Sequence, residues 1–414
     1  MKLIESAVRD PVEKREQMVD MAVSLRYRDS MKIVILGAGF GGLELATRLS
    51  DEIGNTAEIV LIDEKPGFVF GFSKLDVMFG KYTSESVFHP YGAIDKVGVS
   101  FVQATIRSID PERKSVTTDA GEFDADVLVV ALGADLDPSA TSGLVESGHE
   151  FYTVPGAFAL RDVLDSFEGG DVVIGVTSTP FKCPPAPSET ALLMHDFLTR
   201  TGRRANSTIT LVMPLGVPIP PSPGASAALL AAFKERAIDW RPERMVTALD
   251  GDRKSAVLND GETIPFDLFL GVPVHKAPSV VVEAGLTVEG WIPVDPHTLT
   301  TAFPDVYAVG DVTSVGTPKA GVFAEGQASI VADQIIAESQ GTSSGGTYDG
   351  RGICYLEFGS GTVATVDVTF LSGAAPVGEI QGPSIELASS KAEFGSSRIE
   401  RWFNQRWLPG AELV

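Results

Sequence analysis

One glycine-rich turn constrains the fold of this chain more than any other feature. An apolar run over residues 32–36 leads into the turn Gly-Ala-Gly-Phe-Gly-Gly, which starts at Gly37, and a helix-forming stretch follows over residues 43–49. In this G-x-G-x-x-G spacing Gly37 permits a tight turn, Gly39 lets the backbone approach a pyrophosphate, and Gly42 permits close packing of helix on strand. The pattern predicts a strand, a turn and a helix whose N-terminus faces a phosphate group.

A carboxylate after the next predicted strand supports the same interpretation. Residues 58–63 form a second apolar run that ends in Asp63, about two dozen residues after the glycine turn. At this distance the carboxylate would accept a hydrogen bond from a ribose hydroxyl of a dinucleotide. The alternative is a glycine-rich turn that binds no ligand, and the spacing favours the dinucleotide site.

Two later segments indicate which dinucleotide binds. Residues 123–134 read as a buried strand that ends in small residues, and residues 303–311 read as another that ends in Gly310 and Asp311. Both resemble signatures of flavoproteins with two dinucleotide-binding domains, in which the Gly-Asp pair contacts the ribityl and pyrophosphate parts of FAD; an ordinary turn is the alternative. A helix expected from residue 322 to about 338 would stabilise negative charge on the reduced flavin through its N-terminus. The residues expected to bind FAD are Gly37, Gly39, Phe40, Gly42, Asp63, Ala131, Gly133, Gly310, Asp311, Lys319 and Ala320.

The second predicted nucleotide-type strand, residues 171–176, leads into a different kind of loop. Residues 177–185 hold no glycine triplet and contain three prolines, which lack the backbone N–H groups that bind phosphate. This loop disfavours NAD(P)H as the electron donor. It contains Cys183 instead, directly after Lys182, and the only other cysteine of the chain is Cys354.

Motifs along about residues 31–405 resemble the sulfide:quinone oxidoreductases and the flavoprotein subunit of flavocytochrome c sulfide dehydrogenase. In that family two cysteines face each other on one side of the flavin and carry sulfur, and Cys183 and Cys354 match them. The resemblance also implies that Glu189 takes up a proton, and Lys319 is assigned with these residues to catalysis. The motifs are the glycine turn, Phe68-Val69-Phe70, Ala131-Leu132-Gly133, the segment from Phe181 to Glu189, Gly310-Asp311, Pro318-Lys319-Ala320-Gly321 and the segment from Gly352 to Gly359.

Reactivity of the cysteine pair depends on its protonation. A thiolate attacks sulfur far better than a thiol, and Lys182 together with the start of the helix after Ser188 is expected to favour the anion. The alternatives are a carboxylate at a helix start for Glu189 and two buried, inert thiols for the cysteines.

Two positions depart from the family pattern. The quinone-linked enzymes commonly have a third cysteine, and Tyr152 stands at the matching position here, which puts their full mechanism in doubt. The cytochrome-coupled subunit attaches its flavin to a cysteine soon after the second strand. Residues 70–74 contain none, so FAD is expected to bind non-covalently.

Charge and hydropathy exclude several kinds of partner. The net charge of −22 argues against nucleic acid and disfavours anionic lipid surfaces. No apolar run approaches the roughly 20 residues of a membrane span, and residues 1–30 contain no secretory apolar core, so a cytoplasmic location is expected. The aromatic and arginine-rich tail over residues 397–409 suits peripheral contact with the inner face of a membrane; covering of the far side of the flavin or a homodimer contact is the alternative. The five histidines show no metal-ligand spacing, and no metal site is expected.

These features predict an α/β fold with two Rossmann-like dinucleotide-binding domains and a small C-terminal α+β segment. The favoured function is an FAD-dependent oxidoreductase that oxidises sulfide or a persulfide through the cysteine pair and passes electrons to quinone or another small electron carrier. The alternatives are an NAD(P)H-dependent flavin reductase and a non-catalytic sensor that uses flavin and thiols. The expected divisions are an N-terminal extension over 1–30, the FAD-binding domain over 31–150 and 285–345, the second Rossmann-like domain over 151–284 and a C-terminal domain over 346–414.

Overall fold

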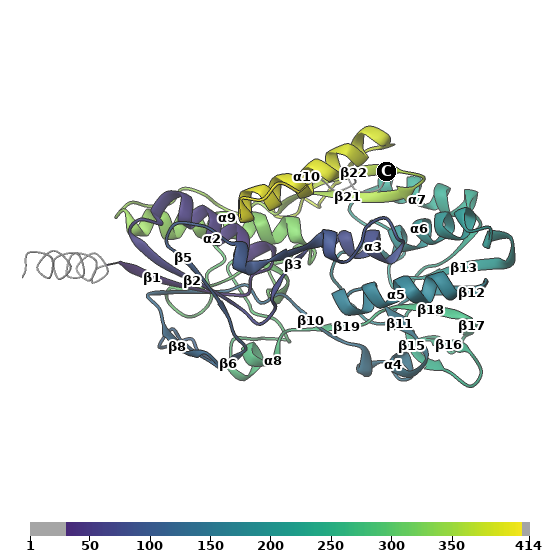
Figure 1. Ribbon diagram of the computed structural model, residues 1–414, viewed down its shortest axis with the longest axis horizontal. Helices are drawn as coiled ribbons and strands as arrows, with labels where there is room; N and C mark the ends of the chain where they lie inside the picture. Colours follow the sequence, from purple (N-terminus) through teal and green to yellow (C-terminus); the bar gives the residue numbers. More distant parts are fainter. Residues whose placement is uncertain (1–29, 408–414) are drawn as a thin grey trace, which may run out of the picture.

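The computed structural model describes residues 30–407, and its first layer is a parallel five-stranded sheet in the order β20-β9-β1-β2-β5 (Figure 1). Alternate side chains of β1 enter two cores, with Ile33 and Ile35 in one and Val34 and Leu36 in the other. Successive residues of a strand point to opposite faces, so this strand is buried on both sides, as a parallel sheet requires. The strands are β1 (Met31–Leu36), β2 (Ala57–Asp63), β5 (Val99–Gln103), β9 (Val127–Val130) and β20 (Val306–Ala308).

Helices cover one face of this sheet and a small antiparallel sheet covers the other. Helices α2 and α9 pack against each other on the first face, and their apolar residues share a core with Ile33 and Ile35. The second face packs on the sheet β6-β7-β8 and on α8. These elements are α2 (Phe40–Ile53), α9 (Gly321–Ser339), β6 (Ile106–Asp110), β7 (Ser115–Thr118), β8 (Gly121–Asp124) and α8 (Ser279–Glu283).

A second parallel sheet repeats the plan in the order β11-β18-β12-β13-β14. Its central strand places Val173 opposite Thr210 and Phe269. One face packs on α5, α6 and α7, and the other on the antiparallel sheet β15-β16-β17. The elements are β11 (His149–Glu150), β12 (Gly170–Val176), β13 (Ser207–Val212), β14 (Ile238–Arg241), β18 (Leu268–Val272), α5 (Val154–Ser166), α6 (Ala186–Arg200), α7 (Pro223–Glu235), β15 (Val246–Asp250), β16 (Ser255–Leu258) and β17 (Thr263–Pro265).

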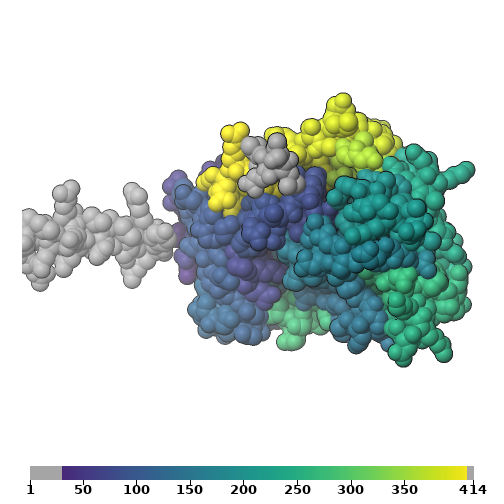
Figure 2. Space-filling view, turned by 45° about the vertical axis from the view of Figure 1, so that its right-hand side comes forward, coloured from purple at the N-terminus to yellow at the C-terminus, as the bar shows by residue number. Residues whose placement is uncertain are grey.

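The C-terminal segment lies over both halves of the molecule. It forms the antiparallel sheet β21-β22-β23, with β21 (Arg351–Gly359), β22 (Thr362–Thr369) and β23 (Glu379–Ser384), followed by α10 (Ile385–Phe403). Strand β21 packs on α6 and α9, and α10 packs on β22 and α2. In Figure 2 the yellow C-terminal residues cover the purple and blue part as well as the teal part.

The predicted α/β class with two Rossmann-like units and a C-terminal α+β segment is confirmed. One predicted strand, residues 123–134, is wrong in its extent: the chain there forms the end of β8 and, after two residues, β9. Asp126 breaks the apolar run because its carboxylate accepts a hydrogen bond from the Lys32 backbone N–H, at 2.7 Å. The predicted N-terminal extension, apart from Ser30, lies outside the described residues. The remaining elements are β3 (Gly67–Val69), β4 (Phe88–Pro90), β10 (Asp135–Asp137), β19 (Val274–Lys276), α3 (Ser73–Met78) and α4 (Leu144–Ser147).

Candidate active site

The glycine turn lies at the carboxyl edge of the first sheet, where the ends of β1, β2, β9 and β20 meet. Gly37 has φ of 99°, and a Cβ there would lie 2.5 Å from the Ala131 carbonyl oxygen. A Cβ on Gly42 would lie 1.9 Å from the Gly37 carbonyl oxygen, so both positions require glycine. A Cβ on Gly39 would meet nothing within 4 Å, and it would fill the space that a pyrophosphate needs.

Asp63 at the end of β2 holds the glycine turn directly. One carboxylate oxygen accepts the Ala38 backbone N–H at 2.8 Å, and the other accepts the Lys65 backbone N–H at 2.9 Å. The hydroxyl of buried Tyr91 donates to the Ala38 carbonyl oxygen at 2.7 Å. The expected ribose acceptor is therefore placed beside the turn, where the two strands end together.

Helices α2 and α9 begin with neither a side-chain cap nor an acidic residue in the first turn. They start at Gly39 and Ala320, whereas side chains cap α5, α7 and α10. Helix α6 also lacks a side-chain cap, but Glu189 lies in its first turn. Free N–H groups at a helix N-terminus attract negative charge. Helices α2 and α9 start at the places where the sequence predicts the pyrophosphate and the reduced flavin.

The Gly310–Asp311 turn joins this edge to Lys319. The Gly310 N–H donates to the Gln327 Oε1 at 2.7 Å. Burial raises the pKa of Asp311, and nearby lysines oppose that rise.

The Lys319 ammonium donates to the carbonyl oxygens of Asp311, at 2.6 Å, and Thr313, at 3.0 Å. Burial lowers the pKa of Lys319 to about 8, and its ammonium lies 3.4 Å from the centre of the Trp291 ring. Its assigned catalytic role stays a prediction.

Cys183 follows the central strand of the second sheet, but its loop bends toward the start of α9. The residue has φ of 49°, and its backbone N–H donates to the Lys319 carbonyl oxygen at 2.7 Å. Its own carbonyl oxygen accepts from the Ala186 N–H at 2.9 Å and from the Tyr152 hydroxyl at 3.4 Å. Tyr152, at the position of the missing third cysteine, therefore supports the loop that holds Cys183.

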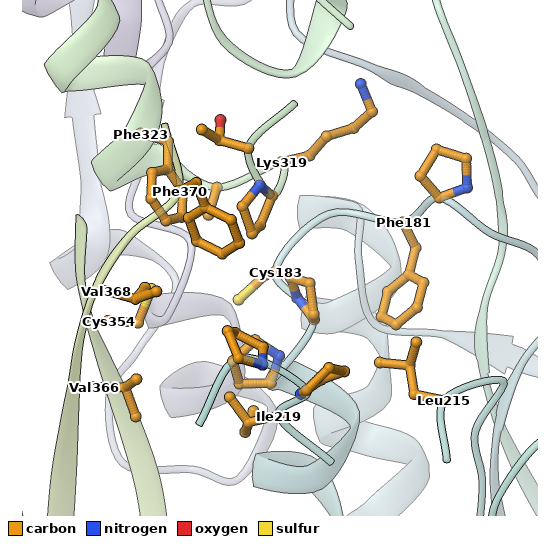
Figure 3. A pocket seen from close by; sticks show the side chains of 18 of the residues that line it. Phe181, Cys183, Leu215, Ile219, Lys319, Phe323, Cys354, Val366, Val368 and Phe370 are labelled. Carbon is orange, nitrogen blue, oxygen red and sulfur yellow. The ribbon is translucent and has the colours of Figure 1, made fainter. Parts of the chain in front are cut away.

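Both cysteines line one cavity of about 480 Å³. They are free thiols, Cys183 on its loop and Cys354 on β21. In Figure 3 the Cys183 sulfur points across the cavity toward the strands that hold Cys354, while the Lys319 ammonium points away from it. The sequence brought these two residues together only through a family resemblance; the structure shows them at one cavity.

The residues around Cys183 and Cys354 do not favour the thiolate form that the sequence predicts. Burial raises the pKa of Cys354 to about 12, and it also raises the pKa of Cys183, although that side chain is open to the cavity. The carboxyl group of Glu189 raises both values further. Lys74 is the cation that lowers the pKa of Cys183 most. The expected contribution of Lys182 stays a prediction.

Glu189 lies behind the cysteines in a buried network of charges. Its carboxylate accepts the Glu357 backbone N–H at 2.9 Å, which ties α6 to the strand of Cys354. The Glu357 side chain pairs with Lys391 of α10 at 2.5 Å, and both are buried. Burial would lower the pKa of Lys391, but Asp76, Glu357 and Glu189 together raise it. Burial raises the pKa of Glu189 to about 7, so this carboxyl group exchanges a proton near neutral pH.

Sequence reasoning missed Lys74, Glu357 and Lys391. Burial, followed by the charge of Lys182, lowers the pKa of Lys74 to about 7. Its ammonium donates to the Tyr152 carbonyl oxygen and lies 5.9 Å from the centre of that ring. Glu357 lies inside a family motif, and Lys74 lies inside the segment 70–74 that departs from the family pattern, so charged residues within these two segments were the available signal. Lys391 had no such signal.

Phe40 and the aromatic tail pack together beside the glycine turn. The Phe40 ring lies 5.2 Å from Phe70 and 5.8 Å from Trp402, centre to centre, and its part in cofactor binding stays a prediction. Trp402 and Phe403 are 0% and 1% exposed, and the Trp407 indole N–H donates to the Ser86 carbonyl oxygen. Trp402 and Phe403 therefore belong to the core and Trp407 is partly buried against it, while contact of the tail with a membrane stays a prediction. Leu408 and Pro409 lie outside the described residues.

A family model for pyridine nucleotide-disulphide oxidoreductases matches residues 31–328. The chain belongs to this family. FAD is the cofactor of its members, and the glycine turn, the open space at Gly39 and the uncapped starts of α2 and α9 fit that cofactor.

Known proteins are similar over most of the chain. A mitochondrial sulfide:quinone oxidoreductase from Mus musculus is 26% identical over 361 residues, which are 83% of this chain and 79% of that protein. The structure of the sulfide:quinone oxidoreductase from Aquifex aeolicus superposes with a TM-score of 0.80 at 22% identity, covering 90% of this chain and 92% of that one. A type II NADH:quinone oxidoreductase from Staphylococcus saprophyticus is 32% identical over 143 residues, 34% of this chain and 36% of that protein. The chain is an oxidoreductase whose relatives include quinone-linked enzymes.

Two kinds of feature are absent from residues 30–407. No helix in this range is both long and apolar enough to cross a membrane. Within the same range, no group of three or more His, Cys, Asp or Glu side chains is arranged to hold a metal ion.

Proposed function

We propose that this flavoprotein oxidises sulfide or a persulfide through Cys183 and Cys354 and passes the electrons to a quinone or another acceptor. The observation that supports this most is the shared cavity: two free thiols from distant parts of the chain line it together with Lys319. Buried Glu189 sits behind the thiols with a pKa near neutrality. Cysteines that only fill a hydrophobic core are not expected to line a cavity together.

The residues support a balanced sequence of steps. Hydrosulfide attacks one sulfur of a Cys183–Cys354 disulfide; an S–S bond forms as another breaks, which leaves a persulfide on one cysteine and a thiolate on the other. After a nucleophile removes the outer sulfur, the dithiol loses two electrons and two protons and becomes a disulfide again. Glu189 accepts one of these protons. FAD, when bound, supplies a two-electron acceptor, and the electron pair then leaves to the quinone.

Non-covalent binding of FAD is part of the proposal. Residues 70–74 contain no cysteine, and both cysteines of the chain lie at the cavity described above. Acid precipitation of the purified protein should therefore release all of the flavin into the supernatant. Flavin that stays with the denatured protein would contradict this point.

A nicotinamide-linked reductase is the second candidate, favoured by the similarity to type II NADH:quinone oxidoreductases. That similarity covers 34% of the chain. The loop over residues 177–185 has three prolines in place of N–H donors, which weighs against a pyrophosphate there. A thiol sensor would undergo one redox change without turnover. A cytoplasmic location, contact with a membrane and a homodimer stay predictions.

Substitution of each cysteine tests the proposal. Cys183→Ser and Cys354→Ser should each abolish anaerobic flavin reduction by sulfide while the FAD content stays at the parent level, because the cofactor residues lie elsewhere. The double variant should be no worse than either single one, since residues that act as a unit fail together. Ser390→Ala, a change at an exposed residue of α10 that does not line the cavity, is the control for purification and handling of the variants. Parent rates in either cysteine variant would overturn the proposal.

A further inference from the structure

The part of the cavity beyond Cys183 has a wall that the proposed steps do not use. It is built by Phe181 and by the proline-rich loop over residues 214–223. Figure 3 shows Phe181, Leu215 and Ile219 at this end, with Lys319, Phe323 and Phe370 at the other end and Cys183 between them. Val366 and Val368 of β22 line the cavity on the side of Cys354.

Charge is scarce in this cavity. Lys319 is the one charged side chain among the described residues that line it. Its ammonium donates to the carbonyl oxygens of Asp311 and Thr313 and lies over Trp291, so these contacts occupy it. Seven of the lining residues are prolines, which offer no backbone N–H. A carboxylate or phosphate on a ligand would find no partner at the proline-rich end.

The size of the cavity also exceeds what sulfide needs. Hydrosulfide has a single heavy atom, whereas the cavity of about 480 Å³ falls in the range of about 300–1,000 Å³ that is common for small-molecule sites. The end at Lys319 and Phe323 adjoins the start of α9, where the flavin is expected. The proline-rich end is therefore left for a second molecule that reaches Cys183.

We propose that this end of the cavity binds an uncharged, apolar organic thiol, which accepts the outer sulfur of the cysteine persulfide. This inference rests on the proposed function and names its second substrate. The thiol enters as RSH, and its sulfur attacks the outer sulfur of Cys–S–SH. The S–S bond of the persulfide breaks and R–S–SH forms, while the proton of RSH passes to the leaving cysteine sulfur, which becomes a thiol again. The sum with the later electron transfer is H₂S + RSH + quinone → RSSH + quinol, which balances in atoms and electrons.

A matched pair of thiols tests this inference on the FAD-loaded full chain. Benzyl mercaptan and 4-(mercaptomethyl)benzoate have the same thiol group and differ by a carboxylate at the far end. With sulfide and decylubiquinone present, the persulfide product is trapped by alkylation and measured by mass spectrometry. The kcat/KM for benzyl mercaptan should exceed that for the carboxylate by at least about tenfold, because the carboxylate would be buried without a partner. Glutathione, which is polar and charged, should rank with the carboxylate.

A change of charge at the apolar wall should reverse this preference. Leu215→Lys places an ammonium at the lining, so the carboxylated thiol should gain about tenfold and benzyl mercaptan should lose activity. Val217→Lys lies two residues away in the same loop, is 40% exposed and does not line the cavity, so it should keep the parent preference. If Leu215→Lys does not fold, the comparison of the two thiols on the parent protein still tests whether the site prefers an uncharged thiol.

The outcomes separate this inference from the proposed function. Sulfide that bleaches the flavin without any thiol dependence of product formation, or equal use of the two thiols, would overturn the inference and leave the proposed function in place. Preference for glutathione would also overturn it. A flavin that sulfide does not bleach at all would overturn the proposed function itself.

Discussion

The loops after β1 and β12 occupy equivalent places and differ in chemistry. Each follows the third strand of a five-stranded parallel sheet and leads to a helix, α2 or α6. The first loop has glycines at Gly37, Gly39 and Gly42, and a Cβ at Gly39 would meet open space. The second has prolines and Cys183, whose backbone N–H donates to the Lys319 carbonyl oxygen. We propose that the same position in the two sheets binds a phosphate in the first and presents a thiol in the second.

The largest expected effect comes from adding a methyl group to the first loop. Gly42→Ala places a Cβ against the Gly37 carbonyl oxygen, which the backbone cannot avoid, so we expect a loss of more than about 3 kcal/mol in folding free energy together with loss of FAD. Gly39→Ala should fold but bind FAD weakly, because its Cβ fills the phosphate space and touches no protein atom. Thermal unfolding and flavin content measure both effects.

Gly345→Ala is the matched control for these two variants. A Cβ at Gly345 also meets nothing within 4 Å, and this residue lies in the loop after α9. It should keep parent stability and parent flavin content. Equal flavin content in Gly39→Ala and Gly345→Ala would show that the open space at Gly39 does not serve the cofactor.

The proton acceptor behind the second loop gives the next effect. The carboxylate form of Glu189 takes the proton, and its pKa is raised to about 7, so the rate of flavin reduction by sulfide should rise with pH through about 7. Glu189→Gln should lose this pH dependence and about a hundredfold in rate. Stopped-flow reduction between pH 5.5 and 8.5 measures it, with the exposed Glu393→Gln as the control. An unchanged pH profile in Glu189→Gln would contradict the assignment.

The same raised pKa has a consequence for stability. A carboxyl group whose pKa is higher in the folded than in the unfolded protein stabilises the fold below its unfolded value, and that stabilisation is lost as pH rises through about 7. Glutamine does not titrate. The melting temperature of Glu189→Gln relative to the parent should therefore be higher at pH 8 than at pH 5.

The smallest effect distinguishes the two lysines near Cys183. The charged form of Lys74 lowers the pKa of that thiol, so Lys74→Met should slow its alkylation by a few-fold at pH 6.5, below the pKa of about 7 of Lys74. Lys182→Met should leave the alkylation rate within twofold of the parent. Both are measured with iodoacetamide in the Cys354→Ser background. The opposite order would favour the role that the sequence suggested for Lys182.

Much of the first loop could be predicted from sequence because its chemistry depends on backbone. Gly37 and Gly42 are required by close contacts between consecutive elements, and such contacts recur at fixed spacing. Asp63 could be predicted for the same reason, because it lies at a fixed distance along the chain from the glycine turn. The strand that ends near Ala131 was predicted too long, because the polar break at Asp126 was not given enough weight.

The position of the second loop could be predicted from the sequence, but the residues that surround Cys183 in the folded protein could not. Cys183 and Cys354 were paired through a family resemblance, since no spacing along the chain indicates contact. The charges that set their protonation come from α3, α6, β21 and α10, which meet only in the folded protein. Lys391 and the apolar wall of the cavity left no local pattern to find. The buried aromatic tail was ambiguous because the same residue types suit a lipid surface and a protein core.

Anaerobic reduction of the flavin by sulfide and by NADH tests the contrast between the loops most directly. The protein as purified with FAD is mixed with each reductant at equal micromolar concentrations, and the absorbance near 450 nm is followed. We predict that sulfide bleaches the flavin within seconds, and that NADH and NADPH do so slowly or not at all, because the proline-containing loop offers no cradle for their pyrophosphate. Rapid bleaching by NADH together with no response to sulfide would contradict the account.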